Sequence, residues 1–577
     1  MRRAAAVAVT LVAAAVVVVL MPGTAAAHPG HALVPWAEQP APASPVLGAF
    51  RPVYGLERAQ NVQGQAAPAP DGPDVLPPPK AQCGPGSNPE TGTQGRVPAS
   101  EVESGRAAQG YWCNAQLVAH FGVSGGYKVE RYVDAVGHEC AFYDTTLLFP
   151  LNAVESRGGL TGVYVLDMTD PSEPVHTATL QTPAMQSPHE SMSLNQKRGL
   201  LAAVAANPLF LPGVVDLYDV SQDCRHPVLQ ASAPVGFLGH ESGFAPDGNT
   251  FYTASLDGRT IAAVDVSNPS LPVTLGVYHF ESHGLSVRDD GNRVYMAADR
   301  RTGSNSTSGL VILDTSEIQA RRPNPQVRVV STLTWALVST PQIAIPVTIG
   351  GHPYVVEMDE FADGDGVGAG RIIDVADETA PRVTSNMRLE VHQAAARATD
   401  QADDPGADFS LQGYAGHYCN VPSRVDPGIV ACTFILSGLR VFDIRDPYDP
   451  KEIAYFNGPI PKVGRAGQPG SAYAMSSPSF VPERGEIWYS DGNTGFYAVR
   501  LTNGVWPFGS PTGGGTGATN TGSSGAGGGA VLDTSGSRQG ALPATGPGAA
   551  PGAGAATAAV LAAVAGLAVR RRMRKTP

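Results

Sequence analysis

Gly162-Val-Tyr-Val-Leu-Asp-Met-Thr-Asp-Pro-Ser-Glu-Pro174 is a pattern that the chain repeats. An apolar run ends in an aspartate, and a proline follows seven residues after that aspartate. Three further copies keep this spacing: Asp265 with Pro272, Asp374 with Pro381, and Asp443 with Pro450. A repeat of roughly 40–50 residues made of short strands, without helices between them, predicts a β-propeller.

Seven repeats can be counted from their first strands, which begin near His138, His189, His240, His283, Gln342, His417 and Ser479. Turn signals such as Pro246-Asp-Gly-Asn249 separate the strands and indicate four strands in each repeat. Residues 114–121 are strand-like but precede the first repeat. We expect them to pair with the last repeat and close the ring, since closure removes exposed strand edges. The predicted fold is therefore an all-β, seven-bladed propeller over residues 110–507.

The segments on both sides of this block are predicted to lie outside the core. Residues 1–27 combine a basic start, an apolar run and a small-residue site at Ala27, which is typical of a signal peptide. Residues 28–109 are rich in Pro, Ala and Gly and indicate an irregular segment. Residues 508–541 are rich in Gly, Ser and Thr and indicate a flexible linker.

The last segment, residues 542–577, contains Leu542-Pro-Ala-Thr-Gly546, an apolar run at about 553–569 and the basic tail Arg570-Arg-Arg-Met-Arg-Lys575. This order resembles the LPxTG sorting signal of wall-anchored proteins of Gram-positive bacteria. The resemblance implies that a sortase cuts between Thr545 and Gly546 and joins Thr545 to peptidoglycan. The alternative is a transmembrane helix that simply anchors the tail.

The repeats themselves resemble the LVIVD-repeat family of secreted propellers. The resemblance rests on Val165-Leu-Asp-Met-Thr-Asp-Pro171, Val264-Asp-Val-Ser-Asn-Pro269 and Val441-Phe-Asp-Ile-Arg-Asp-Pro447. It implies a propeller fold and export from the cell, and it implies no particular activity.

Charge and cysteine content narrow the possible partners and the compartment. The net charge is −12 and no basic cluster lies within residues 111–507, so a nucleic-acid partner is not expected. Six cysteines in an exported chain indicate disulfide bonds. Cys419 and Cys432 lie in one repeat, on strands that are expected to be adjacent. The pairing of the other four stays open: Cys83, Cys113, Cys140 and Cys224.

Five of the seven repeats place a histidine near the start of the first strand: His138, His189, His240, His283 and His417. First strands of propeller blades surround a channel, so these positions are expected to form a ring. Converging imidazoles are good ligands for copper, zinc or iron, which makes a transition metal a candidate cofactor.

The alternative is that these histidines belong to the repeat, line a hydrated channel and form hydrogen bonds with neighbouring strands. Adjacent residues of a strand point to opposite faces. If the imidazoles face the channel, the glutamates that follow three of them are expected to face the adjoining blades or the rim: Glu139, Glu190 and Glu241.

An acidic stretch between residues 358 and 366 is a weaker candidate for calcium. Its oxygen ligands would be Asp359, Asp363 and Asp365, with Glu360 beside them. The spacing does not match an EF-hand, and an acidic hairpin is the alternative. Gly239-His-Glu-Ser-Gly243 has its serine in the wrong place for a hydrolase nucleophile elbow.

Two functional hypotheses follow from the sequence, beside a purely structural role in the cell envelope that would need neither a ligand nor a metal. In the first, the protein is a wall-anchored extracellular propeller that binds a protein, a glycan or a small ligand at the bacterial surface. In the second, it is a metal-dependent oxidoreductase, with copper or another transition metal held by the histidine ring.

Overall fold

The computed structural model describes residues 76–508 apart from 147–160, 256–257, 301–306, 337–339, 361, 364–365, 394–395, 397–400, 402, 408–412 and 465–469. The chain divides into two compact units, Met1–Gly514 and Gly515–Pro577, and every described residue lies in the first unit. The predicted processing residues Ala27, Thr545 and Gly546 lie outside the described residues, as do the linker and the apolar run at 553–569. No helix within the described ranges is long and apolar enough to cross a membrane.

Four-stranded antiparallel sheets make up the first half of the domain, each built from consecutive strands. The first contains β3 (Val129–Val133), β4 (Glu139–Asp144), β5 (Val163–Asp167) and β6 (Val175–Leu180). The second contains β7 (Ser193–Asn195), β8 (Leu200–Val204), β9 (Val215–Asp219) and β10 (Val228–Ala233). The third contains β11 (Gly239–Phe244), β12 (Thr250–Ser255), β13 (Thr260–Asp265) and β14 (Val273–His279). The fourth contains β15 (Leu285–Val287), β16 (Arg293–Arg300), β17 (Thr307–Asp314) and β18 (Arg328–Ala336).

The next two groups of strands share one larger sheet. The fifth group contains β19 (Thr340–Ile349), β20 (His352–Glu360), β23 (Gly370–Asp374) and β24 (Arg382–Asn386). The sixth contains β25 (Gly416–Asn420), β26 (Ile429–Phe434), β27 (Gly438–Asp443), β28 (Lys451–Asn457) and, as an added edge, β1 (Tyr111–Cys113). The two groups are joined through one parallel pairing between Glu360 and Gly416. A small ribbon of β21 (Ala362–Asp363) and β22 (Gly366–Val367) follows β20.

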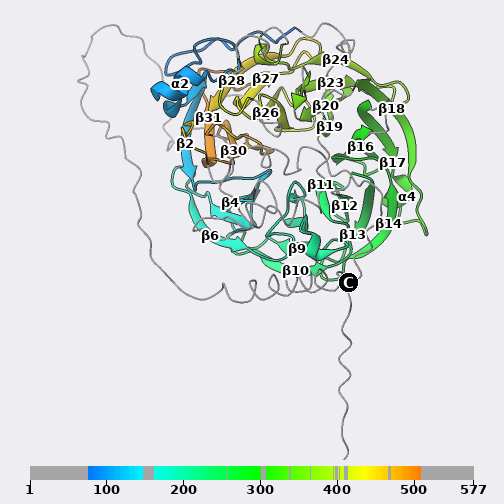
Figure 1. Ribbon diagram of the computed structural model, residues 1–577. Coiled ribbons are helices and arrows are strands. Elements are labelled where there is room, and N and C mark those ends of the chain that lie inside the picture. The colour runs from blue at the N-terminus through cyan, green and yellow to red at the C-terminus, as the bar shows by residue number, and fades with distance from the viewer. Residues whose placement is uncertain are drawn as a thin grey trace, which may run out of the picture. The chain divides into compact units, whose positions relative to one another are not determined.

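The last sheet combines strands from both ends of the domain. It contains β29 (Ser479–Val481), β30 (Glu486–Asp491), β31 (Gly495–Leu501) and β2 (Ala115–Phe121). β2 pairs antiparallel with β31, which is the neighbour expected for residues 114–121. Figure 1 shows the sheets following one another around a common centre. The described residues therefore form an all-β, propeller-like fold.

The repeated aspartate has a local role that explains the sequence pattern. It is the last residue of the third strand in six groups, and its Oδ1 accepts a hydrogen bond from the backbone N–H two residues later. The six pairs are Asp167 with Thr169, Asp219 with Ser221, Asp265 with Ser267, Asp314 with Ser316, Asp374 with Ala376, and Asp443 with Arg445. Such Asx turns end a strand and start the connection to the next one.

Apolar side chains fill the space between neighbouring sheets. Tyr252 and Ile261 of the third sheet pack in one cluster with Leu285, Val294 and Met296 of the fourth. All six residues of β12 are buried, because this strand is covered on both faces. Face-to-face packing of this kind is the main stabilising contribution available to a fold almost without helices.

Disulfides tie distant parts of the domain together. The bond between Cys419 and Cys432 is confirmed across adjacent strands, and the remaining bonds join Cys83 to Cys113 and Cys140 to Cys224. They fit an extracellular protein.

The predicted irregular segment, residues 28–109, is partly ordered. Its described part contains α2 (Ala99–Ser104) and the short 3-10 helix η3 (Ala107–Gln109). Glu90 forms an ion pair with the buried Arg440 at 2.8 Å, which fixes this part against the sixth group. Its composition did not reveal this long-range pair.

Candidate metal centre

Four histidines and two glutamates meet in the interior, and together they are called the His/Glu centre: His189, Glu190, His240, His283, Glu360 and His417. His189 is 4% exposed and the other five are 0% exposed. His189 and Glu190 precede β7, His240 lies in β11 and His283 precedes β15, whereas Glu360 ends β20 and His417 lies in β25. Five consecutive groups of strands therefore contribute to one site.

The two carboxylates lie between the imidazoles of His283 and His417. Nε2 of His283 is 3.5 Å from Oε2 of Glu190 and 3.3 Å from Oε1 of Glu360. Nε2 of His417 is 3.3 Å from Oε1 of Glu190 and 3.0 Å from Oε2 of Glu360. Each carboxylate thus turns one oxygen toward each of these two histidines.

The other two histidines continue the row on one side. The ring centroids of His189 and His240 are 5.0 Å apart, and those of His240 and His283 are 4.1 Å apart. Nδ1 of His240 is 3.4 Å from Oε2 of Glu190. Four of the five histidines predicted for the ring are therefore brought together.

Backbone carbonyls orient two of the imidazoles. Nδ1 of His417 lies 2.7 Å from the carbonyl oxygen of Met475, and Nδ1 of His240 lies 3.2 Å from that of His283. A carbonyl only accepts, so Nδ1 of His417 carries the proton and the lone pair of the neutral ring is on Nε2, beside the carboxylates. Metal-binding histidines are held in this way.

Glycine next to these histidines lets the strands approach closely. A Cβ on Gly416, before His417, would lie 2.2 Å from Sδ of Met358, and one on Gly284, after His283, would lie 2.1 Å from the carbonyl oxygen of Gln342. The backbone leaves no room for a side chain at Gly284, so glycine is required there, whereas at Gly416 the end of the Met358 side chain would have to move.

The prediction that Glu190 faces away from the channel is wrong. His189 has a φ of 51°, in the left-handed region that non-glycine residues rarely adopt. The alternation of an extended strand does not hold there, so Glu190 points into the same centre as His189. A strained backbone of this kind is common at functional sites. The feature of the sequence that could have pointed to Glu190 was the repeated His-Glu pair.

The other two His-Glu pairs contribute no glutamate to the His/Glu centre: Glu139 and Glu241 lie outside it. Glu139 pairs with Arg484 at 2.8 Å. Glu241 pairs with Lys128 at 2.7 Å and accepts a hydrogen bond from the Tyr418 hydroxyl.

His138 does not join the His/Glu centre. It lies between β3 and β4, since the first strand of its sheet is β3 and not the strand that follows the histidine. Tyr127, which precedes β3, takes the place facing the centre instead, with its ring 4.8 Å from His189 and 5.4 Å from His417. The count of repeats from the histidines had assigned β4 as the first strand.

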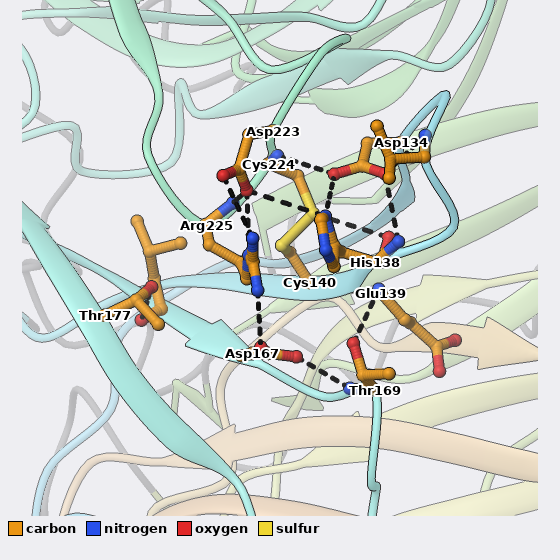
Figure 2. The surroundings of a disulfide bond; sticks show 12 residues. Asp134, His138, Glu139, Cys140, Asp167, Thr169, Thr177, Asp223, Cys224 and Arg225 are labelled. Carbon is orange, nitrogen blue, oxygen red and sulfur yellow. Dashed lines mark hydrogen bonds and ion pairs between the residues drawn. A yellow bond between two sulfur atoms is a disulfide. The ribbon is translucent and has the colours of Figure 1, made fainter.

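His138 belongs to a polar cluster beside the Cys140–Cys224 disulfide (Figure 2). Nδ1 of His138 is 2.9 Å from Oδ2 of Asp134 and 3.7 Å from Oδ1 of Asp223. The Asp134 carboxylate also accepts backbone N–H bonds from Val136, Gly137, His138 and Cys224. Burial alone would raise the pKa of Asp134, but these donors hold it at about 2. A carboxylate so fully used is a structural link between the first and second sheets.

The acidic stretch suggested for calcium is divided. Asp359 forms an ion pair with Arg371 at 2.9 Å, and that arginine stacks over Trp335. The side chain of Asp363 and the whole of Asp365 lie outside the described residues, so a calcium site there stays a prediction. Glu360 leaves the stretch and enters the His/Glu centre, a role that sequence reasoning missed.

Charges inside the centre influence one another. Burial lowers the pKa of the His417 imidazole, but the carboxylates of Glu190 and Glu360 oppose this and raise it to about 9. Burial and the nearby Glu190 carboxylate raise the pKa of the Tyr127 hydroxyl well above its usual range. Both shifts reflect the two carboxylates, which would favour a cation in the site.

A cavity of about 490 Å³ lies along the first strands of several groups. Lys128 and Glu241 line it, together with four other charged residues: Glu130, Lys197, Asp289 and Arg424. The Lys128 ammonium lies 4.3 Å from the centroid of the Tyr418 ring, and Tyr418 follows His417 in the chain. Lys128 and Glu241 of the cavity wall thus contact Tyr418, the residue that follows His417.

Comparisons with known proteins give distant similarities only. No protein-family model and no curated protein matches the chain. Hydrazine synthase of Kuenenia stuttgartiensis is similar at 12% identity and a TM-score of 0.41, over 66% of this chain and 97% of that chain. U3-55K is similar at 10% identity and a TM-score of 0.41, over 67% of this chain and 98% of that chain. A functionally unknown protein from Desulfotomaculum acetoxidans DSM 771 is similar at 13% identity and a TM-score of 0.32, over 46% of this chain and 73% of that chain. Similarities at this level carry no inference about activity.

Proposed function

We propose that the protein is a metal-dependent oxidoreductase whose transition metal is held by the His/Glu centre. The observation that carries the proposal is the convergence of four imidazoles and two carboxylates in a fully buried site. Burying two carboxylates costs several kcal/mol each unless a cation or strong hydrogen bonds compensate. Imidazole and carboxylate together suit first-row metals such as iron, manganese, copper and zinc.

The spacing within the centre fits the ligands of a metal. Charge-assisted hydrogen bonds are about 2.7–2.9 Å long. Elsewhere in this chain, two histidines lie 2.9 Å from a carboxylate: His138 from Asp134, and His352 from Asp374. In the centre, three of the four distances from Nε2 of His283 and His417 to the carboxylate oxygens are 3.3–3.5 Å. Neighbouring ligands at about 2.1 Å from one ion would lie roughly 3.0–3.4 Å apart.

The residues of the centre would act as ligands, and the Lys128–Glu241–Tyr418 group would position a polar substrate that enters from the cavity. A bound transition metal would supply electron transfer to or from that substrate. Burial of the ligands keeps bulk water away from the metal and strengthens electrostatic interactions there.

Metal analysis of protein purified without chelators tests the proposal. We expect at least one equivalent of a transition metal, and its loss in His189→Ala and His240→Ala while the fold is retained. The matched control is His138→Ala, which lies outside the centre and should keep the metal. A metal-dependent absorption that changes reversibly with a mild oxidant and reductant would support the redox role. A wild-type protein that stays metal-free after incubation with Mn²⁺, Fe²⁺, Cu²⁺ and Zn²⁺ would contradict the proposal.

We also propose that the strand groups are seven blades of a propeller of the LVIVD-repeat type, closed by β2. The pairing of β2 with β31 and the six Asx turns support this arrangement. Closure explains why both ends of the domain contribute to one sheet, because it leaves fewer strand edges exposed.

The proposed location is the cell wall of a Gram-positive bacterium, after secretion and cleavage near Ala27. Sortase and peptidoglycan would be the partners, through Thr545. Three disulfides support an oxidising environment. Digestion of purified cell walls should release a fragment whose Thr545 carries peptidoglycan, and a chain truncated before Leu542 should appear in the medium.

A second candidate function is a binding module for an extracellular protein, glycan or small ligand. The cavity, with its mixed charges, favours this candidate. The binding-module hypothesis predicts that a partner recovered from the native surroundings still binds when His189 and His240 are replaced by alanine. The oxidoreductase hypothesis makes no such prediction.

A further inference from the structure

We infer that the His/Glu centre holds two divalent transition-metal ions bridged by Glu190 and Glu360. The inference rests on the proposed function, because it concerns the same ligands. It goes further, because it assigns the number of ions and a distinct role to each carboxylate.

The first observation is the way in which the carboxylate oxygens are divided. Oε2 of Glu190 and Oε1 of Glu360 face Nε2 of His283, at 3.5 and 3.3 Å. The opposite oxygens of the same two carboxylates face Nε2 of His417, at 3.3 and 3.0 Å. A carboxylate that binds one ion through one oxygen and a second ion through the other would be arranged in this way. Two such carboxylates, with one imidazole on each side, define two metal positions.

The second observation is that the donors fall into overlapping groups. Ligand atoms of His189, Glu190 and His240 lie within 4.8 Å of one another, and so do those of Glu190, Glu360 and His417. Glu190 belongs to both groups, as a bridging ligand must. Opposite ligands of one first-row ion are only about 4.2 Å apart, at about 2.1 Å from the metal on each side. Four imidazoles and two carboxylates are therefore better divided between two ions than gathered around one.

The third observation concerns the extra imidazoles. One ion between His283 and the two carboxylates would have His240 next to it, because the rings of His240 and His283 are 4.1 Å apart. The other ion would take His417, whose ring is fixed by the Met475 carbonyl. Paired metal ions in enzymes lie about 3.5–4 Å apart and share carboxylates. The inferred ligand set has the composition that such a pair requires.

The test is to measure how much Mn²⁺ the full chain binds, with Mn²⁺ alone as the probe. After chelation, equilibrium dialysis should give two equivalents of Mn²⁺ for each chain. Electron paramagnetic resonance should show the exchange-coupled signal of a pair instead of the signal of isolated Mn²⁺. Glu190→Gln should bind no more than one equivalent and lose the coupled signal. The matched control is Glu452→Gln, a buried carboxylate outside the centre, which should keep both.

The possible outcomes separate this inference from the proposed function. Two equivalents with coupling support it. One tightly bound equivalent would overturn the two-metal centre and leave the metal-dependent function standing. Two equivalents without coupling would overturn the bridging roles of Glu190 and Glu360. No bound Mn²⁺, together with no binding of Fe²⁺, Cu²⁺ or Zn²⁺, would overturn both. Because the wild-type protein decides these outcomes, the test does not depend on whether a variant folds.

Discussion

Replacement of Glu190 by glutamine should make the metal-free protein more stable, although it damages the site. If Glu190 and Glu360 are both charged, they share one imidazolium, His417, and their ligand atoms lie within 4.8 Å. At an effective dielectric constant of about 20, two like charges at this greatest separation of 4.8 Å repel by roughly 3.5 kcal/mol, and closer charges repel more. The attraction between Glu190 and the imidazolium, at 3.3 Å, is roughly 5 kcal/mol on the same scale.

Glutamine therefore forfeits at most roughly 1.5 kcal/mol of net Coulomb energy, but it removes the cost of burying a carboxylate, which is several kcal/mol. One carboxylate and one imidazolium remain as a neutral pair. We expect Glu190→Gln to raise the free energy of unfolding by about 1–3 kcal/mol in the presence of a chelator.

Bound metal should make the wild-type protein more stable than Glu190→Gln, the reverse of the order expected in the chelator. A ligand present at 100 times its Kd stabilises the folded state by about 2.7 kcal/mol, and wild-type protein should gain this more fully than the variant. The assay is urea unfolding followed by intrinsic fluorescence, with a chelator or with Mn²⁺, and with the slope compared between variants.

The control for this assay is Glu452→Gln. Glu452 is buried and accepts bonds from Arg440 at 3.0 Å and Gln94 at 2.8 Å, so its loss should destabilise the protein with or without metal. The reasoning about Glu190 would be refuted if Glu190→Gln were also less stable than wild type in the chelator. Glu190 would then be a structural hydrogen-bond partner.

Three further predictions concern the scaffold. Asp134→Asn should cost stability in a pH-dependent manner: the lowered pKa, about 2 against an ordinary 3.8, contributes about 2 kcal/mol above pH 4. That contribution is lost as the pH falls from 3.8 toward 2, so unfolding curves of variant and wild type should converge there; a constant difference would contradict it. Replacing Cys140 and Cys224 together by serine opens a link across 84 residues and should cost about 4 kcal/mol, measured as a lower urea midpoint. Ala119→Glu, at a buried position of β2, should weaken the pairing with β31 and promote aggregation measured by light scattering, whereas Gln116→Glu, at an exposed position of the same strand, should not.

Much of the fold could be predicted from the repeat. The aspartate that ends the third strand of six groups accepts a hydrogen bond from the backbone N–H two residues later, so its effect is local and visible in the sequence. The pairing of residues 114–121 with the last strand was predicted because a strand without a repeat needs a partner. The ion pair between Glu90 and Arg440 was missed, since the two residues are far apart in a chain segment without a periodic pattern.

The candidate site was predicted in part. His189, His240, His283 and His417 were expected to converge, and they do. His138 was misplaced because the first strand of its sheet carries Tyr127 at the comparable position. The roles of Glu190 and Glu360 were missed, because one depends on an unusual backbone angle and the other on the end of a second strand.

Sequence alone thus determined the strand unit, the turns that end it and the histidines that most units carry beside their first strands. These features depend on neighbours within a few residues, and local hydrogen bonding and alternation are enough to reveal them. Only the tertiary structure decided that Glu190 and Glu360 face the same imidazoles. Their meeting depends on how five groups of strands are placed around one centre and on the left-handed turn at His189, which reverses the direction that strand alternation would give.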